Sequence, residues 1–282
     1  MARDVTARGS SANFPRDPAR WRLPLTPEQL AARARALLRE AGDPRVARQA
    51  RTYFKEHEKV RFHGVASPRL RQIERDLFRS LGGRWSAREA AAFCDLVLRS
   101  PYSEEKNLGI LLLGRFRKGF EKDLLRQIEA WLREDRCDNW SATDAMCGWV
   151  LAPLLRRYPD LIGRLPTWGG SRNLWLRRAS LAGLVPLARK GEHLDAAYRA
   201  AGALLGDRED LIHKATGWLL REAGKTDAKR LEVFLLQHGP EVPRTALRYA
   251  IERFPRRRRR AILSATRPPL PPRPIRPRGG SA

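Results

Sequence analysis

Two runs of apolar residues separated by a glycine make up the segment NLGILLLGRFRKGFEKDLLRQIEAWLRED (107–135). Apolar side chains recur every three or four residues in each run, at Leu108, Leu111, Leu112 and Phe116 and then at Leu124, Ile128 and Leu132. Side chains at this spacing lie on one face of an α-helix, whereas a half-buried strand alternates apolar and polar residues. Gly119 interrupts the pattern, so the segment predicts two short helices packed as an antiparallel hairpin.

The same helical spacing continues along most of the chain, and no segment shows convincing strand alternation. Breakers at short intervals predict about a dozen helices of roughly 10 to 18 residues. Helical hairpins that repeat every ~35 to 45 residues stack into a solenoid. A single helical bundle is the alternative, but one core would not accommodate so many short helices. We therefore expect an all-α solenoid of antiparallel helix pairs, with a concave basic groove that suits a duplex.

Composition points to a soluble protein that binds nucleic acid. The 282 residues include 56 Lys and Arg against 31 Asp and Glu, a formal charge of +25. Such a chain attracts polyanions, nucleic acid before an anionic membrane. The three cysteines form no CxxC pair and the histidines stand apart, so neither a disulfide framework nor a zinc site is expected. No apolar run suits a membrane span or a signal peptide, and we expect a cytoplasmic protein.

The two ends differ in composition from the helical body. Residues 1–25 are polar and rich in Arg, Ser and Pro, which predicts a disordered basic arm. Residues 267–282 hold too many prolines for a helix, and they follow the run RRRRR (256–260). We expect one helical domain over 26–266, followed by a polyproline-like tail that binds phosphates through charge alone.

An indole and a carboxylate lie one helical turn apart in the segment CDNWSATDAMCGW (137–149). With Asp138 as N-cap, Trp140 and Asp144 fall on one stripe of a largely apolar helix, together with Cys147 and Leu151. An ionised carboxylate is costly there unless it is paired or used. Spacing alone leaves two interpretations: a structural ion pair with an arginine, or a carboxylate at the edge of a cleft that stabilises a cation.

A second segment, IHKATGWLLREAGK (212–225), carries an aromatic residue between two cations. Lys214, Trp218 and Arg221 follow a spacing of four and then three, which places them on one helix face. Such a face suits a phosphate-lined groove, where the cations bind phosphates and the indole packs on a sugar or base. The alternative is an ordinary amphipathic helix with a core tryptophan and solvated cations.

Two further segments carry weaker signals. The segment SRNLWLRRASLAGLVPLARK (171–190) places Arg177 and Arg178 before a long apolar run. The segment TYFKEHEKVRFHGVASPRLRQI (52–73) predicts two helices joined by a turn. The chain lacks a phosphate-binding loop, a dinucleotide-binding glycine motif, a zinc-protease motif and a nucleophile elbow. No metal or organic cofactor is therefore expected.

In this order, the four segments resemble the AlkD-type DNA alkylation repair glycosylases, a family built of HEAT-like repeats. The resemblance spans residues 45–255 and is carried by YFKEHEKVRFHGVASPRLR, DNWSATD, NLWLRRA and HKATGWLLREAGK. It implies a right-handed solenoid of HEAT-like repeats. It also implies an enzyme that hydrolyses the N-glycosidic bond of positively charged N3- or N7-alkylated purines in duplex DNA, without flipping the base.

The resemblance places the catalytic aspartate at Asp144 and two active-site tryptophans at Trp140 and Trp218. Its DNA-contacting arginines fall on Arg178 and Arg221, and an aromatic residue near the cleft, which we also expect to bind DNA, falls on Tyr53. We add Arg177, which neighbours Arg178, and Lys214, which shares the face of Trp218. Two departures, Ala66 and Pro186, concern strand contact and lesion preference rather than the catalytic set.

The expected partner is double-stranded DNA containing alkylated bases, bound by a monomer without membrane contact. The main alternative is a non-catalytic HEAT-repeat scaffold that binds nucleic acid or protein, and an RNA-binding solenoid is a third candidate. A buried arginine bonded to Asp144 would favour the scaffold. A solvent-accessible Asp144, with Trp140 and Trp218 around an open cleft, would favour the enzyme.

Overall fold

The computed structural model describes residues 25–55 and 58–267, and the all-α fold class expected from the sequence is confirmed for them. Their one β-type contact is an isolated parallel bridge between Arg61 and Tyr102. Of the predicted arm (1–25) and tail (267–282), all but residues 25 and 267 lie outside the described part. Within that part, no helix has both the length and the apolar character needed to cross a membrane.

Sixteen α-helices occupy the described chain, more and shorter than the dozen expected. Prolines explain much of the difference, because a proline fits the first turn of a helix and breaks it further in. The first eight are α1 (Pro27–Glu40), α2 (Pro44–Arg51), α3 (Ser67–Ser80), α4 (Ala87–Leu98), α5 (Ser103–Arg115), α6 (Leu124–Arg133), α7 (Trp140–Met146) and α8 (Ala152–Arg157). The others are α9 (Leu165–Gly169), α10 (Leu174–Ala182), α11 (Val185–Ala188), α12 (Leu194–Ala203), α13 (Asp210–Ala223), α14 (Ala228–His238), α15 (Arg244–Ala250) and α16 (Arg256–Ala265).

Four short non-α turns lie between these helices. Three are 3₁₀ turns, η2 (Arg117–Gly119), η4 (Pro159–Arg164) and η5 (Gly239–Glu241). The fourth is a π-helical turn, η3 (Cys147–Leu151), directly after α7. The arginine run at 256–260 is not an extension of the tail, because it forms the first half of α16 after Pro255.

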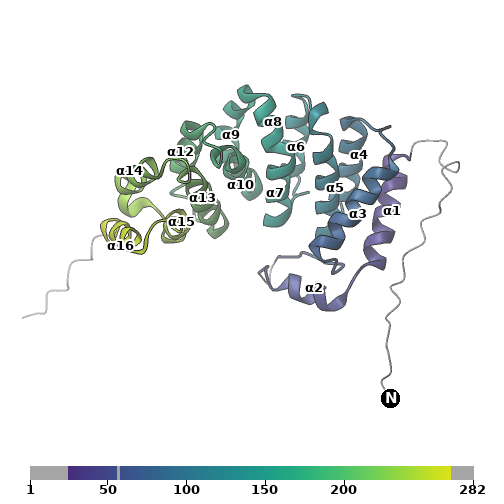
Figure 1. Ribbon diagram of the computed structural model, residues 1–282, viewed down its shortest axis with the longest axis horizontal. Helices are drawn as coiled ribbons and strands as arrows, with labels where there is room; N and C mark the ends of the chain where they lie inside the picture. Colours follow the sequence, from purple (N-terminus) through teal and green to yellow (C-terminus); the bar gives the residue numbers. More distant parts are fainter. Residues whose placement is uncertain (1–24, 56–57, 268–282) are drawn as a thin grey trace, which may run out of the picture.

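The helices follow one another along an arc, as Figure 1 shows. The inner row, which we define as α3, α5, α7, α10, α13 and α15, runs along one side, and each of its helices packs against the next. The other side is formed by helices such as α4, α9, α12 and α14, which pack on their neighbours in the inner row. Residues 107–135 contain most of α5 and all of α6, the two helices expected from that segment.

Local side chains define several helix starts. Thr26 and Gln29 form a capping box at α1, and Ser86 and Glu89 form another at α4. Each box satisfies amide donors that the first helical turn leaves without a partner, which stabilises the helix by about 1 kcal/mol. The apolar faces then meet in a continuous core, and each fully buried leucine contributes about 1.5 to 3 kcal/mol.

Candidate functional site

The start of α7 is held by a buried lysine. Lys106 of α5 is 4% exposed and its ammonium donates to the carboxylate of Asp138 at 2.7 Å and to the carbonyl of Arg136 at 2.7 Å. A buried ammonium needs such partners. Asp138 is therefore not the N-cap expected from the sequence: Asn139 caps the helix by accepting an N–H of the first turn. This arrangement fixes Trp140 as the first residue of α7.

A π-helical turn follows the last residues of α7. Turns of this kind widen the helix and recur at functional sites. The predicted stripe continued past Asp144 to Cys147 and Leu151, but both of these residues are buried in η3 while Asp144 is partly exposed. Trp140 and Asp144 are therefore the two members of that stripe that reach the surface.

Asp144 forms a bidentate ion pair with Arg178 of α10. Arg178 Nε donates to Oδ1 at 2.9 Å and Nη2 donates to Oδ2 at 2.7 Å. The third nitrogen, Nη1, donates to the carbonyl of Leu211 at 2.6 Å. One guanidinium thus connects α7, α10 and α13. The Arg178 side chain is 6% exposed, whereas that of Asp144 is 19% exposed.

The charge of Asp144 reflects two opposing effects. Burial raises the pKa of the Asp144 carboxyl, and the charge and hydrogen bonds of Arg178 oppose that shift. Each carboxylate oxygen receives one hydrogen bond from Arg178, and a carboxylate offers about four acceptor positions. The exposed edge of Asp144 therefore keeps acceptor capacity for a further group.

Trp140 stacks on Phe54, a residue that the sequence patterns did not single out. The two rings lie 5.1 Å apart with an interplanar angle of 18°. Phe54 also contacts Phe62 at 5.4 Å. The preceding residue, Tyr53, is 68% exposed, the highest value for a large apolar side chain within residues 25–55 and 58–267. The segment after α2 therefore covers one face of the indole and presents a free aromatic ring beside it.

Buried carboxylates of α5 hold the segment that follows Phe54. Glu104 accepts the backbone N–H groups of His63, Gly64 and Val65 at 2.9 to 3.2 Å. Glu105 contacts the His63 ring at 2.9 Å. Gly64 has φ of +86°, and a Cβ there would lie 1.9 Å from a backbone oxygen, so only glycine fits. The sequence SEEK (103–106) could have indicated these buried carboxylates, because four polar residues begin a helix whose next turns are apolar.

The face predicted for α13 is confirmed. Lys214, Trp218 and Arg221 are partly exposed, while the residues between them are largely buried. Trp218 packs against the core without being enclosed by it. It lies seven residues after Leu211, hence on nearly the same helical stripe as the carbonyl that binds Arg178.

The cations of this face are already paired in the structure. Lys214 binds Asp210 at 2.8 Å, and Arg221 binds Glu252 of the turn after α15. The hydrogen bond from Lys214 lowers the pKa of the Asp210 carboxyl, and the charge of Lys55 lowers it further.

Arg177 is paired as well. Its Nε donates to Asp207 at 2.7 Å, and its Nη1 donates to the carbonyls of Ser171 and Arg172. The Asp207 side chain is 8% exposed and that of Arg177 is 16% exposed. Arg177 and Arg178 thus bind two different aspartates. Of these two, only Asp144, the partner of Arg178, lies on the helix that carries Trp140.

The two discriminating observations point in different directions. A buried arginine does bind Asp144, which is what the scaffold alternative expects. The Asp144 side chain is also partly accessible to solvent, and both tryptophans are partly exposed. The enzyme interpretation predicts this exposure. Arg178 has all three guanidinium nitrogens in use, so its first role is to position Asp144 rather than to stand free for phosphates.

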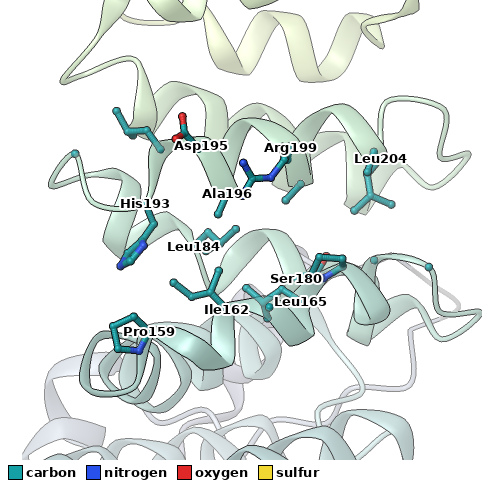
Figure 2. A pocket seen from close by; sticks show the side chains of 18 of the residues that line it. Pro159, Ile162, Leu165, Ser180, Leu184, His193, Asp195, Ala196, Arg199 and Leu204 are labelled. Carbon is teal, nitrogen blue, oxygen red and sulfur yellow. The ribbon is translucent and has the colours of Figure 1, made fainter.

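A cavity of about 1010 Å³ lies elsewhere, between η4, α9 and α12. Figure 2 shows its lining, which includes Ile162, Leu165, Leu184, His193 and Arg199. It shares no lining residue with the predicted site. Among the residues that the structure describes, no group of three His, Cys, Asp or Glu side chains is placed to hold a metal ion.

Comparisons with known proteins agree on one family. A family model described as "DNA alkylation repair enzyme" matches residues 34–254. A solved structure described as "Predicted DNA alkylation repair enzyme from Enterococcus faecalis" superposes with a TM-score of 0.67. It is 18% identical, and the match covers 76% of this chain and 97% of that chain, a likeness of fold. No curated protein matches.

Proposed function

This chain belongs to the DNA alkylation repair enzyme family, and from that premise we propose that it is a DNA glycosylase releasing N3- and N7-alkylated purines from duplex DNA. The family supports a DNA substrate and a role in repair of alkylated DNA. The observation that carries the glycosylase proposal is the Asp144–Arg178 pair, a partly exposed carboxylate held one helical turn from Trp140.

The chemistry needs little acid catalysis. An N3- or N7-alkylated purine is a cation, so its glycosidic bond is weakened before the enzyme acts. When the bond breaks, its electron pair neutralises the leaving base and positive charge develops on the deoxyribose. A site for this reaction therefore needs a fixed negative charge near the sugar and a positioned water, but no second carboxyl group.

Asp144 suits the negative charge because Arg178 fixes the carboxylate plane. Preorganised charge of this kind is among the largest contributions to catalysis, and it needs no rearrangement as the transition state forms. The bidentate pair does not consume the carboxylate, since its exposed edge can face the sugar and orient water. We therefore assign Arg178 as a positioning residue and Asp144 as the catalytic residue.

Trp140 and Trp218 add to the same effect. The faces of aromatic rings attract cations, and each such contact is worth about 0.5 to 2 kcal/mol. Phe54 stacks on one face of Trp140, and we assign the other face to the substrate. Tyr53, which is largely exposed, adds an aromatic contact beside it.

The inner row is the surface that we assign to the duplex. In this proposal the helices form a right-handed solenoid of HEAT-like repeats, and a monomer binds the DNA backbone along its concave side. The lesion then meets Asp144 without leaving the stack for a base pocket. For such a role we propose a cytoplasmic location, on the nucleoid while the protein is bound to DNA.

A base-release assay tests the proposal. Duplex DNA treated with a methylating agent is incubated with the protein, and free 7-methylguanine and 3-methyladenine are measured by chromatography. We expect release from methylated DNA and none from unmodified DNA. Duplex binding without release of any alkylated base would favour the scaffold alternative.

A further inference from the structure

Five exposed arginines lie on and between α15 and α16, the last two described helices. We define the α15–α16 arginine surface as Arg248, Arg253, Arg256, Arg257 and Arg260. Within the described residues, none of these five side chains has a hydrogen-bond or ion-pair partner. The cations on α10 and α13, in contrast, bind neighbouring carboxylates or carbonyls.

The run of arginines opens a helix, where positive charge is unfavourable. The amide groups of a first turn carry partial positive charge, which favours anions. The first turn of α16 contains no acidic residue, and Pro255 supplies no side-chain cap. Arg258 is neutralised by Glu232 of α14, at 2.8 Å, and Arg256, Arg257 and Arg260 remain exposed. A polyanion would relieve this repulsion.

The helix that carries Arg248, α15, is held against the helix that carries Trp218. α15 packs closely on α13, and a Cβ at Gly217 would lie 2.5 Å from the Tyr249 side chain and from the carbonyl of Ala246. Gly217 precedes Trp218, and Arg221 binds Glu252, so α13 contacts both α15 and the turn that follows it. In Figure 1, α15 and α16 follow α13 at one end of the arc.

The chemistry of the surface favours DNA over a membrane. A helix that binds a bilayer keeps a broad apolar face for the lipid. α16 uses its large apolar side chains in the fold: Ile262 is 1% exposed, and Leu263 packs against the core. Tyr249, 38% exposed beside Arg248, is an aromatic that packs well on deoxyribose.

We propose that the α15–α16 arginine surface is a second DNA-binding site, which holds the phosphates of the duplex to one side of the lesion. The inference rests on the DNA substrate of the proposed function. It makes the contact with DNA asymmetric: the duplex is held beyond Trp218 by cations that have no structural partner, while the base is released at Asp144.

A variant with matched charge tests this assignment. Arg253, Arg256, Arg257 and Arg260 are replaced by alanine in the full chain. The control replaces Arg88, Arg126, Lys190 and Lys229, four exposed cations on other elements, so that both proteins lose the same charge. Thermal unfolding of both should match the wild type. Affinity for unmodified duplex is then measured over a range of salt concentrations.

We expect the arginine-surface variant to bind duplex about 10- to 100-fold more weakly, with a salt slope smaller by about 2 to 4. The control should change by less than about threefold. Single-turnover base release at saturating enzyme should be unchanged, because the site at Asp144 is intact. Equal losses in the two variants, or an unchanged salt slope, would overturn the inference.

Two further outcomes are separable. If the variant loses binding to anionic phospholipid vesicles and keeps its affinity for duplex, the surface binds membranes and the inference is wrong. If the wild type releases no base, the proposed function is wrong. The affinity of the two variants for unmodified duplex still tests whether the α15–α16 arginine surface binds DNA. Methylated duplexes with the lesion near one end or the other then test the asymmetry, because the wild type should prefer the duplex that extends over the surface and the variant should lose this preference.

Discussion

The cations of α10 and α13 differ from those of α15 and α16 in what they bind. Arg177, Arg178 and Arg221 each contact a carboxylate of the protein, and their side chains are at most 21% exposed. The arginines of the α15–α16 arginine surface are exposed and have no partner among the described residues. A net charge of +25 is therefore a poor guide to which cations meet DNA. Cations in the first region shape the site, and those in the second are free for phosphates.

The largest stability difference between the regions should follow from Arg178→Ala. The change leaves the partly exposed Asp144 without its arginine partner and removes the donor to the Leu211 carbonyl. Breaking a buried pair in this way costs about 3 to 5 kcal/mol of unfolding free energy. Arg257→Ala, in the second region, should change it by less than about 0.5 kcal/mol. Urea unfolding of the two variants makes the comparison, and equal stabilities would remove the distinction.

A pH dependence should mark the first region alone. Burial raises the pKa of Asp144, so the carboxylate becomes protonated at a higher pH than an exposed aspartate. Base release should then fall about tenfold per pH unit below that pKa. The folded state also binds this proton more tightly than the unfolded state. Lowering the pH between the ordinary and the raised pKa therefore adds stability, which is lost as the pH rises through the raised value.

Asp144→Asn is the control for this dependence. The variant should lack the step in unfolding free energy across that range of pH, because the amide does not titrate. Persistence of the step in Asp144→Asn would assign the titration to another group.

A smaller effect is expected from Trp140→Leu. The change removes an aromatic face worth about 0.5 to 2 kcal/mol to a cation, so single-turnover release should slow by roughly 2- to 30-fold. Trp140→Phe keeps a ring that can stack on Phe54 and should recover most of the rate. Duplex affinity should be nearly constant in both. A loss of affinity without a change in rate would make Trp140 a binding residue only.

The smallest effect should follow from Glu252→Gln, which removes one of the two carboxylates that Arg221 contacts and leaves Glu222 at 3.3 Å. Releasing Arg221 from Glu252 frees its Nη1 donors for phosphate, while Nε keeps its contact with Glu222. Partly exposed pairs are worth about 0.2 to 1 kcal/mol, so duplex affinity should rise by roughly 1.5- to 5-fold. Glu232→Gln, which frees Arg258 instead, gives a matched comparison. Weaker binding in Glu252→Gln would show that the pair itself shapes the DNA surface.

Periodicity was sufficient for the fold class and for the face of α13, because both depend on spacing along one segment. It could not identify the partner of Asp144, since Arg178 lies 34 residues away on another helix. Either interpretation of a lone carboxylate fits the same spacing. The structure shows that the ion pair and the partly exposed carboxylate are the same group.

Other differences have local causes. Asp138 has the chemistry of an N-cap, but the buried ammonium of Lys106 requires its carboxylate, and Asn139 takes the capping role. The role of Phe54 depends on a loop that Glu104 holds against α5, a contact over 39 to 41 residues that no local pattern encodes. Helix number was underestimated because prolines in first turns start helices as well as end them.

Single-turnover release of 7-methylguanine by Asp144→Asn and Asp207→Asn tests the central claim most directly. Asp144 pairs with Arg178 and Asp207 pairs with Arg177, the neighbouring arginine on α10. Each change weakens one of these two largely buried ion pairs, so similar losses of stability are expected. At saturating enzyme and a temperature where both are folded, we predict that Asp144→Asn loses at least about 100-fold in rate, as removal of a preorganised charge does, while Asp207→Asn stays within about threefold of the wild type. Equal rates in the two variants would contradict the assignment of Asp144 as the catalytic residue.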